Sequence, residues 1–177
     1  MKSAVGHAVR CLYLLCGMAD CADAADDSEL MQACERGFDD IANYKMYVTG
    51  AVGSTNIGEA FTIKYDLPNE KAYAETCASI GLIFFAHRML QMDMDSRYGD
   101  VMERALYNVV LGSASRDGKR FFYVNPLEVW PKACGGNPDK QHVKPVRQKW
   151  FGCACCPPNV ARLMASLNQY LYSTDED

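Results

Sequence analysis

The chain has 177 residues, 49% of them hydrophobic, which indicates a globular domain with its own core rather than a disordered segment. A net charge of −4 without a basic cluster argues against nucleic-acid binding, because phosphate contacts need grouped Lys and Arg. The sequence shows neither an apolar run long enough to cross a bilayer nor the apolar region and cleavage site of a signal peptide, so we expect no membrane partner.

Apolar residues recur at helical spacing near the start of the chain, and they predict two helices. The first covers 3–18 and leads into a short acidic connection over 19–25. The second covers 29–43, and Asp26-Asp27-Ser28 supplies side-chain oxygens just before its start, as helix caps do. Each helix presents one apolar face to the core: Ala4, Ala8, Cys11, Leu12 and Leu15 in the first, and Leu30, Ala33, Cys34, Phe38 and Ile41 in the second.

The segment 47–61 breaks the helical pattern with Gly50, Gly53 and Gly58, and the last of these directly precedes Glu59. A glycine-rich loop of this kind often presents a functional side chain. Two interpretations of this carboxylate are open. It is either a solvated loop residue or a general acid/base whose pKa is raised by partial burial.

Two further helices are predicted over 76–93 and 97–111, and Asp95 or Ser96 caps the second. The segment 113–149 is mostly irregular, and a loop of this length is uncommon in a compact domain unless it is functional. Within it, Asp117-Gly118 predicts a hairpin turn and 120–124 a short strand. A last helix begins at Pro157 and Pro158 and turns these residues inward: Val160, Leu163, Met164, Leu167 and Leu171. We therefore expect a mainly α fold with long irregular loops and a few short strands.

The nine cysteines fall into two kinds. Those scattered over the predicted helices indicate reduced, packed thiols in a cytoplasmic protein: Cys11, Cys16, Cys21 and Cys34. By contrast, Cys153, Cys155 and Cys156 cluster just before the last helix. A thiolate there faces the positive end of the helix dipole, which lowers its pKa, so it can bind a soft metal or act as a nucleophile. A structural zinc knuckle and a redox pair are the alternatives.

Glu75 and Cys77 are candidates for completing a metal site. Both can face one ion if the carboxylate lies in the extended approach to helix 76–93 and the thiol lies in its first turn. With Cys155 and Cys156 they give three thiolates and one carboxylate, a donor set that suits Zn²⁺. The alternative is a packed core thiol beside an ordinary charge at a helix N-terminus.

His7 is predicted to lie on a helix face, where a lone histidine is more often a core residue than a catalyst. Tyr123 lies in the predicted short strand, where it either packs or presents its hydroxyl to a substrate or a thiolate. Four residues receive no assigned role: His87, Cys134, His142 and Cys153.

Five motifs occur in order along the chain: Gly53-Ser54-Thr55, Gly58-Glu59-Ala60-Phe61, Glu75-Thr76-Cys77-Ala78, Phe122-Tyr123-Val124-Asn125-Pro126-Leu127 and Cys155-Cys156-Pro157-Pro158-Asn159. This ordered set resembles glycoside hydrolase family 127, the β-L-arabinofuranosidases, over nearly the whole chain. The resemblance implies a longer protein with an (α/α)6-barrel catalytic domain followed by β-sandwich domains. Residues 1–177 would be the C-terminal part of that barrel, and the acidic end at 173–177 reads as if more protein followed.

The resemblance also implies roles for single residues. Cys155 looks like the nucleophile and Glu59 like the general acid/base, while His7 and Tyr123 resemble sugar contacts. The residues that look like zinc ligands are Glu75, Cys77, Cys155 and Cys156.

Two alternatives accompany the implied retaining hydrolysis of β-L-arabinofuranosides. One is a non-catalytic helical module with a structural zinc site, and the other is a related glycosidase that acts on another furanoside. The implied partners are a carbohydrate substrate, the rest of the barrel and the β-sandwich domains, and a homo-oligomer is also compatible with the sequence.

Overall fold

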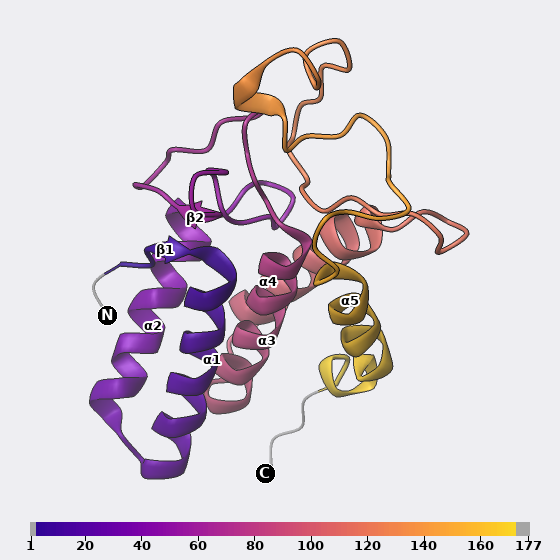
Figure 1. Ribbon diagram of the computed structural model, residues 1–177. Coiled ribbons are helices and arrows are strands. Elements are labelled where there is room, and N and C mark those ends of the chain that lie inside the picture. The colour runs from indigo at the N-terminus through magenta and orange to yellow at the C-terminus, as the bar shows by residue number, and fades with distance from the viewer. Residues whose placement is uncertain (1–2, 173–177) are drawn as a thin grey trace.

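The computed structural model describes residues 3–172, and within them five α-helices form the body of the protein (Figure 1). They are α1 (Ala8–Ala25), α2 (Ser28–Tyr44), α3 (Thr76–Met92), α4 (Ser96–Ala105) and α5 (Cys156–Ala165). Helix α3 packs against α1, α4 and α5, and α2 packs against α1. The prediction of a mainly α protein with long loops is confirmed. The acidic end, Ser173–Asp177, lies outside the described residues.

Helix α3 lies at the centre of the fold, and its residues from Thr76 to Ala86 are all buried. Its sequence is apolar on nearly every side, as expected of a helix that has neighbours all round. Phe85 meets Phe38 of α2 with ring centroids 6.1 Å apart, and Phe38 meets Tyr98 of α4 edge-on at 4.7 Å. These rings join three helices into one core.

The first helix begins and ends later than predicted. Gly6 adopts a positive φ of 76°, which breaks the helix, and Gly6–His7 form strand β1 instead. The predicted acidic connection over 19–25 is wrong, because the helix continues through these mostly alanine and aspartate residues to Ala25. Alanine is the strongest helix former, so the local preference extends the helix to its left-handed end at Asp26.

Two predicted caps are confirmed. The Asp27 side chain accepts hydrogen bonds from the backbone N–H groups of Glu29 and Leu30, and Asp95 accepts one from Arg97 at the start of α4. The helix predicted over 97–111 is split, because α4 ends at Ala105 and a π-helical turn covers Leu106–Leu111.

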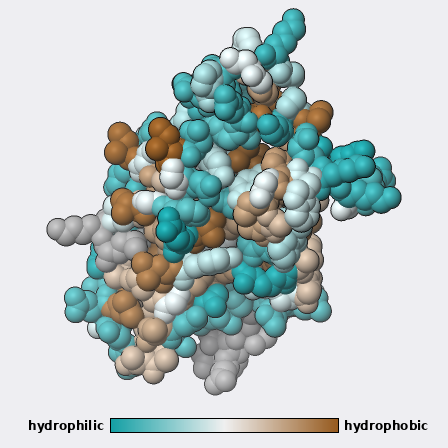
Figure 2. Space-filling model, viewed as in Figure 1, coloured by the Kyte–Doolittle hydropathy of each residue, from teal (hydrophilic) through white to brown (hydrophobic). Residues whose placement is uncertain are grey.

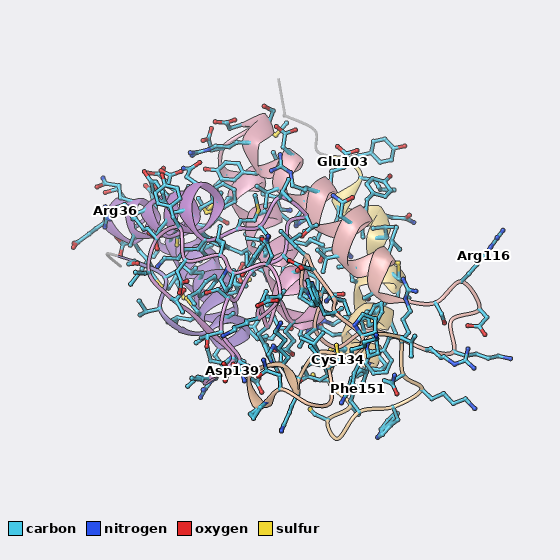
Figure 3. All side chains as sticks on the ribbon, turned by 90° about the horizontal axis from the view of Figure 1, so that it is seen from above. Arg36, Glu103, Arg116, Cys134, Asp139 and Phe151 are labelled. Carbon is cyan, nitrogen blue, oxygen red and sulfur yellow. The ribbon has the colours of Figure 1, made fainter. Side chains whose placement is uncertain are left out.

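The long segment between α4 and α5 folds over the end of the bundle where α1, α3 and α5 begin (Figure 1). The predicted turn is confirmed, since Gly118 has a φ of 68° and its N–H donates to the Ser115 carbonyl. The predicted strand over 120–124 is reduced to isolated bridges. Figure 3 shows Cys134, Asp139 and Phe151 of this segment along one edge, with Arg116 pointing away from the body.

The last helix starts with its two prolines in the first turn, as predicted, and Leu163 is fully buried. The helix ends at Ala165, and a 3₁₀ turn covers Leu167–Tyr170. The predicted inward position of Leu171 is wrong, because that residue is exposed. Within residues 3–172, none of the helices combines the length and apolarity that spanning a bilayer requires. Figure 2 shows apolar residues dispersed among polar ones on the viewed face.

Candidate functional site

The start of α3 supplies one half of a four-residue donor cluster. Glu75 is extended, with φ −63° and ψ 136°, and Cys77 lies in the first turn that follows. The Glu75 side chain does not cap its own helix but lies with Oε1 3.4 Å from Cys155 Sγ. This is the arrangement that allows residues two apart to face one point, as the sequence analysis required.

The start of α5 supplies the other half. Cys155 directly precedes the helix, and Cys156 is its first residue. Because α5 packs against α3, the Cys156 Sγ lies 3.6 Å from Cys77 Sγ and 3.7 Å from Cys155 Sγ. Cys77 and Cys156 are buried, while Cys155 is half-buried. The four predicted ligands therefore come together.

The spacing of these donors fits a tetrahedral metal ion. All four ligand atoms lie within 4.8 Å of one another. A Zn²⁺ with sulfur ligands at ~2.3 Å and an oxygen ligand at ~2.1 Å separates two sulfurs by about 3.8 Å and a sulfur and an oxygen by about 3.6 Å. The observed separations of 3.6, 3.7 and 3.4 Å are close to these values. The sulfurs are also too far apart for disulfides, and all nine cysteines, which fall within the described range, are free.

The pKa values in the cluster follow from four acidic groups sharing one buried place. Hydrogen bonds from the Cys156 and Cys77 thiols hold the pKa of Cys155 far below its ordinary value. Hydrogen bonds to Cys155 raise the pKa of both Cys77 and Cys156, and burial raises the pKa of Glu75 to about 8. A bound dication would lower the pKa values of all four groups, because it stabilises their charged forms.

Glu59 lies across from this cluster at the start of α1. Strands β1 and β2 (Ala60–Phe61) pair antiparallel, with His7 opposite Ala60. The Ala8 N–H donates to the Glu59 carbonyl over 2.9 Å. Glu59 itself has a φ of 52°, in the left-handed region that few non-glycine residues occupy. The loop is thus held in a strained form that turns this side chain toward the site.

His7 holds the Glu59 carboxylate, and it does so from a strand rather than from the predicted helix face. Its Nε2 lies 3.0 Å from Glu59 Oε2. Its Nδ1 accepts the Arg10 N–H, so Nε2 carries the hydrogen and donates it to the carboxylate. His7 therefore orients the Glu59 carboxylate and also lines the cavity.

Tyr123 is fixed against the start of α3 although it is not part of a strand. The Thr76 N–H donates to the Tyr123 carbonyl over 2.9 Å, and the Asn125 side chain donates to Ala74 and Thr76. The Tyr123 hydroxyl oxygen lies 3.0 Å from Cys155 Sγ. Tyr123 thus packs its ring against Tyr73 and Phe151 and also presents its hydroxyl to the Cys155 sulfur.

A cavity of 530 Å³ opens over these residues, a size within the range of small-ligand sites. The lining residues that were predicted from the sequence as site residues are His7, Glu59, Glu75, Cys77, Tyr123 and Cys155. Cys156 lies beneath them, fully buried. Other lining residues are Val9, Tyr13, Cys153, Pro158, Asn159 and Arg162. The sequence-based set therefore converges on one place, and all three helices that begin here direct the positive ends of their dipoles toward its acidic groups.

Two residues at the site were not predicted from the sequence: Tyr73, whose ring contacts Tyr123, and Asn159, which lines the cavity together with Cys77. The Asn159 Oδ1 accepts hydrogen bonds from Tyr13 and Arg162. A signal existed for each residue. Tyr73 precedes Glu75 by two positions in the sequence, and Asn159 follows Cys155 by one helical turn.

Two of the residues without an assigned role lie away from the cavity. His87 packs against Tyr170 with ring centroids 4.5 Å apart, and the Cys134 thiol donates to the Trp130 carbonyl. His142 lies behind the site, next to Tyr73, whereas Cys153 is exposed at the cavity rim.

Comparison with known proteins gives the same family from sequence and from structure. The family model described as "Beta-L-arabinofuranosidase, GH127 catalytic domain" matches residues 1–169. A "Non-reducing end beta-L-arabinofuranosidase" of Bifidobacterium longum subsp. longum is 46% identical over 172 residues, which is 97% of this chain and 26% of that protein.

Two solved structures are similar throughout. The crystal structure of a GH127 β-L-arabinofuranosidase from Geobacillus stearothermophilus T6 superposes with a TM-score of 0.96 at 58% identity, over 100% of this chain and 28% of that one. A GH127 β-arabinofuranosidase gives a TM-score of 0.87 at 44% identity, over 97% of this chain and 25% of that one. The chain thus spans about a quarter of each of these relatives. It belongs to the GH127 β-L-arabinofuranosidase catalytic-domain family.

Proposed function

We propose that the protein containing this chain is a zinc-dependent retaining glycoside hydrolase that removes non-reducing-end β-L-arabinofuranosyl residues from glycans or glycoproteins. The observation that carries this proposal is the cavity in which Cys155, one of four clustered donors, faces the Glu59 carboxylate. The Glu75 carboxylate lies between them, within 4.8 Å of Glu59 and 3.4 Å from Cys155. The printed activity of the relatives supplies the sugar.

A retaining glycosidase needs a nucleophile and an acid on opposite sides of the anomeric carbon. A Zn²⁺ held by Glu75, Cys77, Cys155 and Cys156 supplies the charge that keeps thiols ionised at neutral pH. The Cys155 sulfur attacks the anomeric carbon, and a C–S bond forms as the bond to the leaving oxygen breaks. Glu59 gives its proton to that oxygen.

The second half of the reaction reverses these roles. Water attacks the anomeric carbon, Glu59 takes a proton from it, and the C–S bond breaks to return the Cys155 thiolate. Two inversions leave the configuration unchanged. His7 keeps the carboxylate oriented in both steps, and the Tyr123 hydroxyl stabilises the sulfur when it carries negative charge.

The proposal extends to the surrounding protein. We place these helices in the later part of an (α/α)6 barrel, which the rest of the chain completes and β-sandwich domains follow. The relatives, of which this chain spans about a quarter, are long enough for such additions. A cytoplasmic location and a homo-oligomer stay predictions, the first supported by the free thiols.

The test is the Cys155→Ser variant of the full-length protein. We expect turnover of an aryl β-L-arabinofuranoside to disappear while zinc stays bound through the other three ligands. Cys21→Ser is the matched control, because this exposed thiol on α1 lies outside the cavity, and it should keep full activity. Unchanged turnover in Cys155→Ser would refute the nucleophile. Bound zinc without any glycosidase activity in the wild-type protein would favour the structural-module alternative.

A further inference from the structure

One wall of the cavity is polar and takes no part in the bond making and breaking described above. Cys155, Asn159 and Arg162 follow one another at spacings of four and three residues, so their side chains share one face of α5. All three line the cavity, and Tyr13 of α1 joins them. The rise from Cys155 to Arg162 is about 10 Å, and helical side chains lean back toward the N-terminus of their helix. Arg162 therefore reaches into the part of the cavity beyond the proposed nucleophile.

The Arg162 guanidinium is held in place although the residue is exposed. Its Nη2 donates to the Tyr13 hydroxyl and to Asn159 Oδ1, each over 2.8 Å. The Tyr13 hydroxyl donates in turn to Asn159 Oδ1 over 3.3 Å, which closes a triangle. The guanidinium carbon also lies 4.5 Å from the centroid of the Phe84 ring of α3. Contacts from three helices thus fix one charged group, which lowers the entropy that a ligand would lose on binding to it.

These contacts leave donors for a ligand. A guanidinium has five N–H groups in one plane, and the triangle uses the two on Nη2. The same cavity lining contains the Glu59 and Glu75 carboxylates, which accept hydrogen bonds. A ligand that spans both parts of the lining must therefore give hydrogens to the acids and lone pairs to Arg162. The hydroxyl groups of a sugar can do both.

We propose that Arg162 is a specificity-determining residue that donates to a sugar hydroxyl remote from the anomeric carbon, on C3 or C5 of the arabinofuranosyl residue. This inference rests on the proposed function, because it assigns a task within that reaction. With the anomeric carbon at the Cys155 sulfur, the C2 hydroxyl lies next to the reacting bond, whereas the C3 and C5 hydroxyls lie farther away. Arg162, two helical turns from Cys155, is placed for the distant hydroxyls.

Arg162 and Tyr13 also bound the space that the sugar can fill. Both residues line a second cavity of 470 Å³, which extends along the helices to Asp20 and Arg88. The hydrogen-bonded pair therefore separates the two cavities and closes the proposed sugar site at this end. Once a sugar displaces water here, a substrate without the matching hydroxyl leaves the Arg162 donors unpaired, so it should be rejected.

The test measures kcat/KM of the full-length protein on p-nitrophenyl β-L-arabinofuranoside and on its 2-deoxy, 3-deoxy and 5-deoxy analogues. Zinc is kept saturating, because Arg162 also holds Asn159 beside the metal cluster. For the wild type, the 3-deoxy or the 5-deoxy analogue should be about tenfold to a hundredfold poorer than the parent, the effect of losing one hydrogen bond to a charged group.

Arg162→Met removes the donors and keeps an apolar side chain on Phe84. We expect the parent substrate to lose about tenfold to a hundredfold in kcat/KM, and the penalty for the 3-deoxy or 5-deoxy analogue to shrink below about threefold. The penalty for the 2-deoxy analogue should stay as in the wild type. A purely structural role would instead lower kcat/KM by the same factor on all four substrates.

Arg88→Met is the matched control. Arg88 is also a long cation held by an acceptor pair, since it donates to Asp20 over 2.7 Å and to the Phe84 carbonyl over 3.0 Å. It lines the second cavity and not the proposed sugar site, so all four kcat/KM values should stay unchanged. Should Arg162→Met not fold, Arg162→Lys keeps the charge and the stem but lacks the planar fork, and the same penalty should shrink.

The role of Arg162 is overturned if the wild type shows no penalty for the 3-deoxy and 5-deoxy analogues, or if their penalties are the same in the variants. Both results leave the proposed function intact. Cys155→Ser, measured alongside, separates the two claims. If that variant turns over the parent substrate, or if the wild-type protein turns over none of the four, the proposed function fails and the role of Arg162 fails with it.

Discussion

The two sides of the site are built differently. The thiol side is made from two helix starts that pack together, and its Cys77 and Cys156 are 3% and 0% exposed. The carboxylate side is made from a glycine-rich loop, and the Glu59 side chain is 38% exposed. A metal centre needs donors that do not move, whereas an acid/base has to exchange protons with water. The difference in construction matches the two proposed tasks.

The comparison also shows where each side is vulnerable. On the thiol side the positions follow from helix packing, so loss of a buried donor, Cys77 or Cys156, leaves the remaining buried acids without a shared cation. On the carboxylate side Glu59 has a left-handed backbone, which costs of order 1–2 kcal/mol for a non-glycine residue. That conformation persists because hydrogen bonds from Ala8 and His7 hold it. Substitutions on the carboxylate side should therefore lower activity in part rather than abolish it.

The largest effect is expected from removing a donor on the thiol side. Cys77→Ala removes a buried donor and leaves a cavity in its place, whereas Cys155→Ser keeps an oxygen at a half-buried position. We therefore expect Cys77→Ala to lose bound zinc and measurable turnover. Metal analysis together with an activity assay measures this. Cys34→Ala is the control, since that thiol is fully buried in α2 outside the cluster and should cost stability alone. Stoichiometric zinc in Cys77→Ala would show that zinc binding does not require the Cys77 thiolate.

A smaller but still large effect is expected from Glu59→Gln, which keeps the shape and removes the exchangeable proton. General acid–base catalysis contributes about 10²–10⁴-fold, so kcat/KM on a poor leaving group should fall by that range. Zinc content should stay unchanged, because Glu59 lies outside the donor set. Glu70→Gln, whose carboxylate pairs with Lys140, should have neither effect. A loss of zinc in Glu59→Gln would mean that the two sides are not separable.

The sequence predicted the two sides unequally well. Side-chain spacing located the thiol side, because helix starts bring Glu75 and Cys77 to one face and the two prolines mark the start of α5. The carboxylate side depends on pairing between distant segments, and short-range periodicity carries no information about that. The sequence analysis therefore placed His7 on a helix, whereas its pairing with Ala60 makes it part of a strand.

The long loop shows the same limit. Its turn at Asp117-Gly118 follows from local residue preference and was predicted. The contact of Tyr123 with α3 and of His142 with Tyr73 arises from packing between distant parts of the chain. The fold class and the donor cluster could thus be predicted from local patterns, whereas the contacts that hold the Glu59 carboxylate could not.

A moderate effect, confined to the affinity for zinc, is expected from Asn159→Ala. Asn159 lines the cavity together with Cys77, and Arg162 donates to its oxygen over 2.8 Å, so its NH₂ group is the one that can donate to the Cys77 sulfur. Partners of metal ligands typically contribute about 10–100-fold in affinity, so zinc affinity should fall by that range in a chelator competition. kcat at saturating zinc should change little. An unaltered affinity would show that the thiol side is held by its four donors alone.

A small and indirect effect on turnover is expected from Asp40→Asn, which acts on the carboxylate side through the chain before β1. Asp40 is buried, its Oδ2 lies 2.9 Å from Lys45 Nζ, and it accepts the Ala4 N–H over 2.8 Å. Through Ala4 it anchors the chain three residues before His7. Breaking a buried pair of this kind costs about 3–5 kcal/mol of unfolding free energy at neutral pH. Turnover should fall only severalfold, because β1 is still paired with β2.

The pH dependence of stability isolates this contribution. Burial alone would raise the pKa of Asp40, but hydrogen bonds from Lys45, Ser3 and Ala4 outweigh it and hold the pKa below its ordinary value. A carboxyl with a lowered pKa stabilises the fold above its unfolded value of about 4, and that stability is lost as the pH falls through the folded pKa. The difference in unfolding temperature between wild type and Asp40→Asn should therefore be constant from about pH 7 to pH 5 and shrink below about pH 4. A difference that stays constant down to about pH 2 would show that Asp40 is not ionised in the fold, and that β1 is anchored without the ion pair.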